Sequence, residues 1–286
     1  MTVVAFSVLA LLLAADSLVA GPVETVADGF QFTEGPVWTV KGELIFSDIP
    51  ADTNYRADKS VAFKPSGKSN GMTLDGEGRI IRCEHGNRRV VRIGADNSIT
   101  VLADAYEGKK LNSPNDAVWH RDTGIIYFTD PPYGLEGREQ EQPVQGIYAI
   151  HPDGRLARIA DDFIKPNGIA LSPDGTRLYV ADTEGNHIRA FTLSKDGAAA
   201  GGSVLCKIIT PDGIRVDTEG RIWATSSRGV VVFDAAGNEL ETIEFPQIPA
   251  NCGFGGPDGK TLYTTARTAV YSVKTKATGL VGGWAR

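Results

Sequence analysis

The feature that most constrains the fold of this chain is a hairpin unit that occurs six times. In its clearest copy, residues 165–187, a short apolar run opens with Asn167-Gly168 and ends in the turn Ser-Pro-Asp-Gly, and a second apolar run follows. Short runs rich in β-branched and aromatic residues, joined by Pro-Asp-Gly, are typical of two paired strands. Similar units begin at positions 34, 70, 115, 212 and 251.

The spacing of these copies predicts the architecture. Their starts lie 36, 45, 52, 45 and 39 residues apart, and third and outer apolar runs follow in most copies, for example at 89–93 and 99–103. Four short strands recurring every ~40–50 residues are typical of a β-propeller blade. We therefore expect an all-β fold, a six-bladed β-propeller of four-stranded antiparallel blades. Two unrelated β-sandwiches are the alternative, but they would have no reason to repeat six times.

The last copy offers only three strands before the chain ends. Residues 23–27 precede the first blade and can supply the missing outer strand. We expect the two termini to share the last blade, because this closure leaves no open sheet edge between the first and last blades. The predicted domain is a single propeller over residues 21–286.

The N-terminus differs from the rest of the chain. Residues 3–15 form a continuous apolar run that is followed by small residues. This pattern resembles a secretory signal peptide over residues 1–20 and is short for a membrane span. We therefore expect a periplasmic or secreted protein that has no membrane association once the signal is removed. The alternative is a wrongly assigned start or a buried first strand, and then a cytoplasmic protein.

Charge and cysteine content exclude several classes of function. A net charge of −6 and a pI near 5.3 provide no basic surface for nucleic acid. Cys83, Cys206 and Cys252 are odd in number and far apart, so they predict buried thiols and not a disulfide framework or a zinc knuckle. The sequence also has no G-x-S-x-G motif and no histidine pair at zinc spacing.

The first strand of each propeller blade lines the central channel, so the residues that open these strands should meet at one mouth. Most of them are followed by glycine or another small residue, which allows backbones to approach closely. Two carboxylates and several amides make an oxygen-only site, which suits hard cations and Ca²⁺ first among them. Taken alone, each Asn-Gly or Asp-Gly is a common turn. The predicted ring is Glu34, Asn70, Asn115, Asn167, Asp212 and Asn251.

Three further residues follow second strands and are candidates for substrate binding. They are His85, Tyr133 and Arg228. Each would reach the channel mouth if its loop overhangs it, and His85 would then also be a candidate acid–base group. The alternative for each is an ordinary surface loop. Asn70 and Asn115 join these three as candidate substrate-binding residues.

Several motifs together resemble the gluconolactonase-like family, which includes regucalcin (senescence marker protein) and luciferin-regenerating enzyme. They are EGPVW at 34–38, SPND at 113–116, TDPPYG at 129–134, PNG at 166–168 and PDG at 211–213. TDPPYG, together with CEHGNRR at 83–89, looks most like the bacterial gluconolactonases. The resemblance runs from about residue 23 to the C-terminus and implies the same six-bladed fold.

The resemblance also implies roles for individual residues. It implies one divalent cation held by Glu34, Asn167 and Asp212, with Asn115 on the metal or the substrate and Asp212 also the general base. The cation expected is Ca²⁺, with Zn²⁺, Mn²⁺ and Mg²⁺ as alternatives. Some family members carry a substrate-binding arginine two residues before the matching asparagine. This chain has Ser113 there, which puts the details of sugar recognition in question.

The function expected is metal-assisted hydrolysis of a sugar lactone, a small-molecule substrate, by a monomer or weak oligomer. One alternative is a phosphotriesterase or fluorophosphatase that uses the same metal site. Another is a non-catalytic propeller that binds a partner protein, although such a protein has no reason to place acids beside amides in its channel. A strictosidine-synthase-like condensing enzyme is a third alternative, but its catalytic glutamate has no clear match in the sequence.

Overall fold

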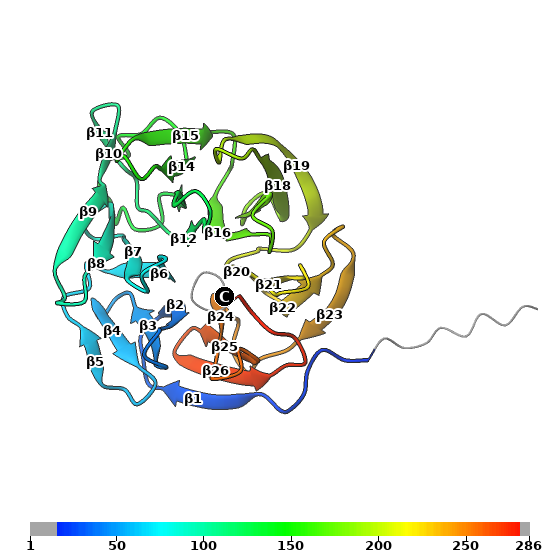
Figure 1. Cartoon of the computed structure of the whole chain (residues 1–286). Coiled ribbons are helices and arrows are strands. Elements are labelled where there is room, and N and C mark those ends of the chain that lie inside the picture. The colour runs from blue at the N-terminus through cyan, green and yellow to red at the C-terminus, as the bar shows by residue number, and fades with distance from the viewer. Residues whose placement is uncertain (1–15, 281–286) are drawn as a thin grey trace, which may run out of the picture.

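Six four-stranded antiparallel sheets are arranged around a central axis in the computed structural model of the chain, which describes residues 16–280 (Figure 1). The described residues contain no helix. The predicted all-β, six-bladed propeller is therefore confirmed.

The blades follow one another in chain order, and the first strand of each blade lies nearest the axis (Figure 1). A two-stranded hairpin, β10–β11, lies outside the blades. The first three blades are β2 (Thr33–Trp38), β3 (Leu44–Asp48), β4 (Thr53–Arg56) and β5 (Val61–Phe63); β6 (Ser69–Leu74), β7 (Ile80–Glu84), β8 (Arg89–Ile93) and β9 (Ile99–Ala103); and β12 (Ala117–Trp119), β13 (Ile126–Asp130), β14 (Gly146–Ile150) and β15 (Leu156–Ala160). The hairpin is β10 (Ala105–Tyr106) and β11 (Lys109–Lys110). The last three blades are β16 (Pro166–Leu171), β17 (Arg177–Asp182), β18 (His187–Leu193) and β19 (Ala199–Lys207); β20 (Ile214–Val216), β21 (Ile222–Ser226), β22 (Gly229–Phe233) and β23 (Glu239–Ile243); and β24 (Asn251–Gly255), β25 (Thr261–Ala266), β26 (Ala269–Lys274) and β1 (Glu24–Asp28).

Two inner strands begin later than the repeat predicts. β12 starts at Ala117 instead of Asn115, and β20 starts at Ile214 instead of Asp212. The backbone N–H of Asn115 still donates to the carbonyl of Thr129 at 2.8 Å, within the same blade. The repeat therefore locates both residues correctly, although they precede the regular ladder.

The ring is closed by the two ends of the described chain. β1 pairs antiparallel with β26, with Glu24 opposite Ser272 and Asp28 opposite Ala269. A β-bulge interrupts the register between Thr25 and Ala27. The prediction that the termini share the last blade is therefore confirmed.

The predicted signal peptide, residues 1–20, falls largely on residues 1–15, which lie outside the described residues. The segment that follows contacts the propeller. The hydroxyl of Ser17 and the backbone N–H of Leu18 both donate to the carboxylate of Glu241 at 2.6 Å, and Val19 forms a bridge with Thr275. Export stays a prediction.

The apolar core lies between neighbouring blades. Tyr179 and Ile188 of the fourth blade, for example, pack with Ile222 and Val231 of the fifth. The three cysteines are buried free thiols, as the sequence predicts. Burial of this kind supplies the main stabilisation of a propeller, because each blade leaves an apolar face that only its neighbours can cover.

Hydroxyl groups near the ends of two second strands bind the first blade to the second and the third blade to the fourth. Ser47 donates to the carbonyl of Asn70 at 2.8 Å, and Thr129 donates to the carbonyl of Asn167 at 2.7 Å. In both cases the acceptor belongs to a residue that opens the inner strand of the following blade. These buried hydrogen bonds therefore fix the backbone at the channel mouth.

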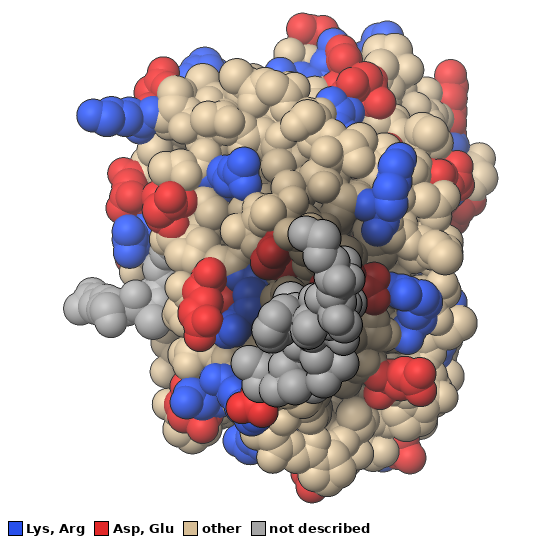
Figure 2. Space-filling model, turned by 90° about the vertical axis from the view of Figure 1, so that its right-hand side faces the viewer, with Lys and Arg blue, Asp and Glu red and all other residues tan. Residues whose placement is uncertain are grey.

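The surface is mixed in charge where Figure 2 shows it. On the side of the molecule near β19 and β23, basic and acidic side chains lie interspersed among uncharged ones. No helix long and apolar enough to cross a membrane occurs within residues 16–280.

Candidate metal and substrate site

A cavity of about 530 Å³ opens at one mouth of the central channel. This volume falls within the range of about 300–1,000 Å³ that is typical of small-molecule sites. Five of the six residues in the predicted ring line it, and four of these are almost completely buried at its base. The five are Glu34, Asn70, Asn115, Asn167 and Asp212.

Glycine makes this convergence possible. The N–H of Gly168 donates to the carbonyl of Asp212 in the next blade at 2.9 Å, and a Cβ on Gly168 would lie 2.3 Å from that oxygen. Gly71 approaches the carbonyl of Asn115 in the same way, with its N–H at 2.8 Å. No side chain fits at these points, so the glycines that follow ring residues are required by the close approach of backbones.

Three amide oxygens at the base of the cavity are buried and have no hydrogen-bond partner within residues 16–280. They are the Oδ1 atoms of Asn70, Asn115 and Asn167. The nitrogen of Asn167 donates to Thr183 Oγ1 at 3.1 Å, and the nitrogen of Asn70 lies 3.3 Å from His85 Nε2. These contacts orient both amides so that their oxygens are left without a donor. A buried acceptor without a partner costs about 1–3 kcal/mol, which a cation would offset.

The two acids beside these amides resist ionisation. Burial, and then the charge of Asp212, hold the pKa of Glu34 well above its usual range, although the N–H of Gly35 donates to its Oε2 at 2.7 Å. Burial raises the pKa of Asp212 to about 7, with the Asn167 amide acting against it and the charge of Asp116 adding to it. Two neighbouring carboxylates in such a place favour a positive ion between them.

The donor set fits a hard divalent cation. Ca²⁺ is coordinated by six to eight oxygen ligands, among them carboxylate and amide oxygens, and two ionised acids balance the charge of one divalent cation. No group of three or more His, Cys, Asp or Glu side chains with metal-binding geometry occurs among residues 16–280. The predicted ligands Glu34, Asn115, Asn167 and Asp212 all line the cavity, while the identity of the metal stays a prediction.

His85 and Tyr133 both line the cavity. His85 is buried, and burial lowers the pKa of its imidazole to about 4, so the ring is neutral at pH 7 and serves as a hydrogen-bonding group. The hydroxyl of Tyr133 lies 3.5 Å from the nitrogen of Asn167, and burial raises its pKa to about 12. The Nζ of Lys165 lies 4.8 Å from the centre of the Tyr133 ring.

Arg228 does not reach the cavity, which corrects its prediction as a substrate-binding residue. Its guanidinium pairs with Glu239 of β23 at 2.6 Å, on the exposed side of the fifth blade. Its neighbour Ser227 lines the cavity instead. The corresponding turn of the last blade does bring a cation to the cavity, Arg267, which the sequence reasoning missed. The signal was available, because Arg267 also directly follows a second strand.

Ser113 has a bracing role. It is fully buried, its hydroxyl donates to the carbonyl of Pro131 at 2.6 Å, and it accepts from the N–H of Gly134 at 2.8 Å. These two bonds hold the loop that carries Tyr133. Ser113 therefore positions the loop that forms part of the cavity wall, but does not itself line the cavity.

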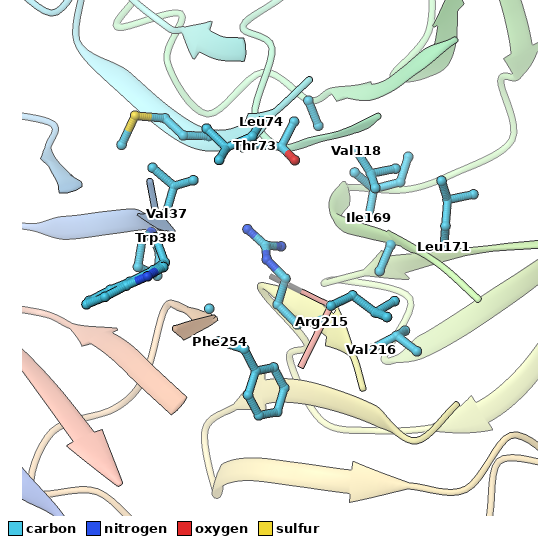
Figure 3. A pocket seen from close by; sticks show the side chains of 16 residues that line it. Val37, Trp38, Thr73, Leu74, Val118, Ile169, Leu171, Arg215, Val216 and Phe254 are labelled. Atoms are coloured by element: carbon cyan, nitrogen blue, oxygen red, sulfur yellow. The ribbon is translucent and has the colours of Figure 1, made fainter. Parts of the chain in front are cut away.

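The other end of the channel is lined mainly by apolar side chains. Figure 3 shows Arg215 projecting among Val37, Leu74, Ile169 and Phe254 around a small cavity of about 80 Å³. Beneath the oxygen-lined cavity, the Arg215 guanidinium reaches the buried carboxylate of Asp116 at 3.1 Å. The three unpartnered amide oxygens of the ring therefore lie at the opposite end of the channel from this apolar lining.

Comparison with known proteins identifies the family. The family model described as the SMP-30/gluconolactonase/LRE-like region matches residues 32–268. The chain belongs to this family. It is 34% identical to a gluconolactonase of Zymomonas mobilis over 91% of this chain and 83% of that protein. A pentonolactonase of Haloferax volcanii is 29% identical over 81% of this chain and 80% of its own length.

A solved structure of the family has the same fold. The gluconolactonase of Xanthomonas campestris superposes with a TM-score of 0.82 at 35% identity, covering 88% of this chain and 89% of that one. The SMP-30/gluconolactonase/LRE-like match, residues 32–268, includes all five ring residues that line the cavity. The family resemblance read from the sequence motifs is therefore confirmed.

Proposed function

We propose that this chain is a lactonase that opens a sugar lactone by hydrolysis with the help of one divalent cation, Ca²⁺ in the first instance. The observation that carries the proposal is the set of three unpartnered amide oxygens, buried beside two acids of raised pKa in a cavity of substrate size. The names of the relatives from Zymomonas mobilis and Haloferax volcanii support the reaction class.

Glu34, Asn115, Asn167 and Asp212 are the residues proposed to hold the cation. When bound, it would supply Lewis-acid polarisation of the lactone carbonyl and stabilise the charge that develops on its oxygen. The amides add ligand oxygens without adding charge, so the site stays near neutrality. No serine or cysteine nucleophile is needed, because a lactone is an activated ester.

Asp212 is the proposed base, since it is the less buried of the two acids and faces the cavity. Its carboxylate takes a proton from a water molecule as the water oxygen bonds to the carbonyl carbon. The ring carbon–oxygen bond then breaks, and the ring oxygen takes a proton, which gives the hydroxy acid. Because a cation at the same carboxylate weakens its basicity, orienting the water is a large part of this role.

The walls of the cavity suit a polyhydroxylated substrate. Asn70, His85, Asn115 and Tyr133 place amide, imidazole and phenol groups around the acids. These groups both donate and accept hydrogen bonds, as sugar hydroxyls do. We propose that they bind the sugar and hold its carbonyl toward Asp212.

A pH-stat assay with glucono-δ-lactone tests the proposal. Activity should be lost with EDTA, return with Ca²⁺, and fall at least 100-fold in Asp212→Asn. Asp153→Asn is the matched control, because Asp153 also sits in a Pro-Asp-Gly turn but is exposed and far from the cavity. Activity that survives chelation would contradict the cation's role. A folded protein that hydrolyses phosphotriesters but no lactone would replace the proposal with the phosphotriesterase alternative.

A further inference from the structure

Arg267 is the only lysine or arginine that lines the oxygen-lined cavity among residues 16–280. It lies in the turn between β25 and β26, with a left-handed backbone (φ 49°) and an exposed side chain. The carbon of its guanidinium lies 5.4 Å from the centre of the Phe32 ring. The side chain therefore rests against an aromatic ring at the rim and keeps its hydrogen-bonding edge available.

Arg267 differs from the other cations near the channel in having no acidic partner. Lys165 pairs with Glu184 at 2.7 Å, and Arg215 pairs with Asp116 at 3.1 Å. No ion pair and no side-chain hydrogen bond links Arg267 to any residue of the described part of the chain.

The charges of the site leave Arg267 uncompensated. Glu34 and Asp212 together match the charge of one divalent cation, and Asp116 is matched by Arg215. With the cation in place, Arg267 gives the cavity one positive charge in excess. A substrate that carries a negative charge is therefore favoured over a neutral one of the same shape.

The walls of the cavity are also unlike one another. The part around Arg267 comes from the first and last blades and is mostly apolar, whereas the opposite part carries amide, imidazole and hydroxyl groups. A bound sugar can therefore point its hydroxyls to the polar side, while a charged end reaches Arg267 over the apolar side. The apolar members of the wall are Phe32, Ile49, Pro50, Ile248 and Pro249.

We propose that the substrate is an anionic sugar lactone, with a carboxylate or phosphate on the part of the molecule remote from the lactone carbonyl, and that Arg267 binds this group. The inference rests on the proposed lactonase function and narrows its substrate class. A guanidinium presents two parallel N–H donors, which match either oxyanion.

The test compares three lactones: neutral glucono-δ-lactone, 6-phosphoglucono-δ-lactone and a glucaric acid monolactone. The Ca²⁺-loaded wild type should prefer an anionic lactone, and the better of the two identifies carboxylate or phosphate. Arg267→Met should lower kcat/KM for that lactone by about tenfold or more, mainly through KM, and change the neutral one less than about threefold. Arg267→Lys should retain part of the preference.

Arg228→Met is the matched control, because Arg228 occupies the same turn of the neighbouring blade but pairs with Glu239 away from the cavity. It should leave all three rates unchanged. A wild type that prefers the neutral lactone, or an equal loss on all three lactones in Arg267→Met, would overturn the inference.

Calorimetry separates this inference from the proposed function. Binding of 6-phosphogluconate or glucarate to the Ca²⁺-loaded protein should weaken about tenfold or more in Arg267→Met. If the wild type hydrolyses no lactone but this loss is seen, the reaction is wrong and the anion site stands. If neither acid binds more tightly than neutral sorbitol, the anion site is wrong, whatever the activity.

Discussion

Replacing Arg215 by methionine is expected to destabilise the propeller by about 3–5 kcal/mol at pH 7, because it leaves a buried carboxylate without its cation. Methionine keeps most of the aliphatic stem that packs in the apolar end of the channel (Figure 3). The change therefore removes the charge and its hydrogen bonds more than it removes packing.

The magnitude follows from the surroundings of Asp116, which is fully buried. Its Oδ2 lies 3.1 Å from Arg215 Nη1, a distance at which two unit charges attract by about 5 kcal/mol at an effective dielectric constant of 20. The donors that remain are the N–H of Ala117 at 2.9 Å and the amide of Asn251 at 3.5 Å. These two neutral donors offset only part of the loss.

Urea unfolding followed by circular dichroism measures the effect in a double-mutant cycle. Asp116→Asn combined with Arg215→Met should recover at least half of the stability lost in the single variant, since no charge is then left buried.

Two results would refute this reasoning. One is a loss below about 1 kcal/mol at pH 7, which would mean that Asp116 is solvated or otherwise paired. The other is a double variant as unstable as the single one, which would make shape and not charge the cause.

Three further outcomes are expected. Burial raises the pKa of Asp130 to about 7, against 3.8 in the unfolded chain, so the stabilisation that its proton provides is lost as the pH rises through 7. The slope of unfolding free energy against pH, measured with urea between pH 4 and 7, should therefore become flatter in Asp130→Asn by up to about 1.4 kcal/mol per pH unit. An unchanged slope would contradict this. Calorimetric Ca²⁺ affinity should rise with pH, since protons compete with the cation for the carboxylates of Glu34 and Asp212, and a flat profile would exclude both acids as ligands. If residues 1–20 are an export signal, sequencing of the periplasmic protein should find Gly21 at its start. This form should melt a few degrees below a chain that begins at residue 16, because the longer chain keeps the contacts of Ser17 and Leu18 with Glu241. Equal melting temperatures would show that those contacts contribute no stability.

The repeat made the fold and most of the site predictable from the sequence. The six copies align in one repeat register, and the first strand of every blade lines the same channel. These two facts predict that residues at equivalent positions meet at one mouth, as do Glu34, Asn70, Asn115, Asn167 and Asp212. The glycines after ring residues were predictable for the same reason, since close packing around a narrow axis leaves no room for a side chain.

The contacts that the sequence did not predict depend on the direction in which individual side chains point. Arg228 and Arg267 lie one position apart in equivalent two-residue turns, and this single step sends one outward to Glu239 and the other to the cavity. Arg82 of β7 is fully buried, where it pairs with Glu84 of the same strand and donates to Asn54 of the first blade at 3.1 Å. Asn54 comes from another blade, and strand periodicity does not describe contacts between blades.

Because β1 and β26 close the ring, the circular order of the blades does not depend on where in the circle the chain begins and ends. A chain with its natural ends joined and new ends opened in an exposed turn between two other blades would keep every blade beside the same neighbours. It would also keep contacts across the channel, such as that of Arg215 with Asp116. Catalysis in such a permuted protein would depend on completing the circle, because Glu34 and Asp212 come from the first and fifth blades. Enzyme activity would thus report, without any spectroscopic label, when the two blades at the new ends close the ring.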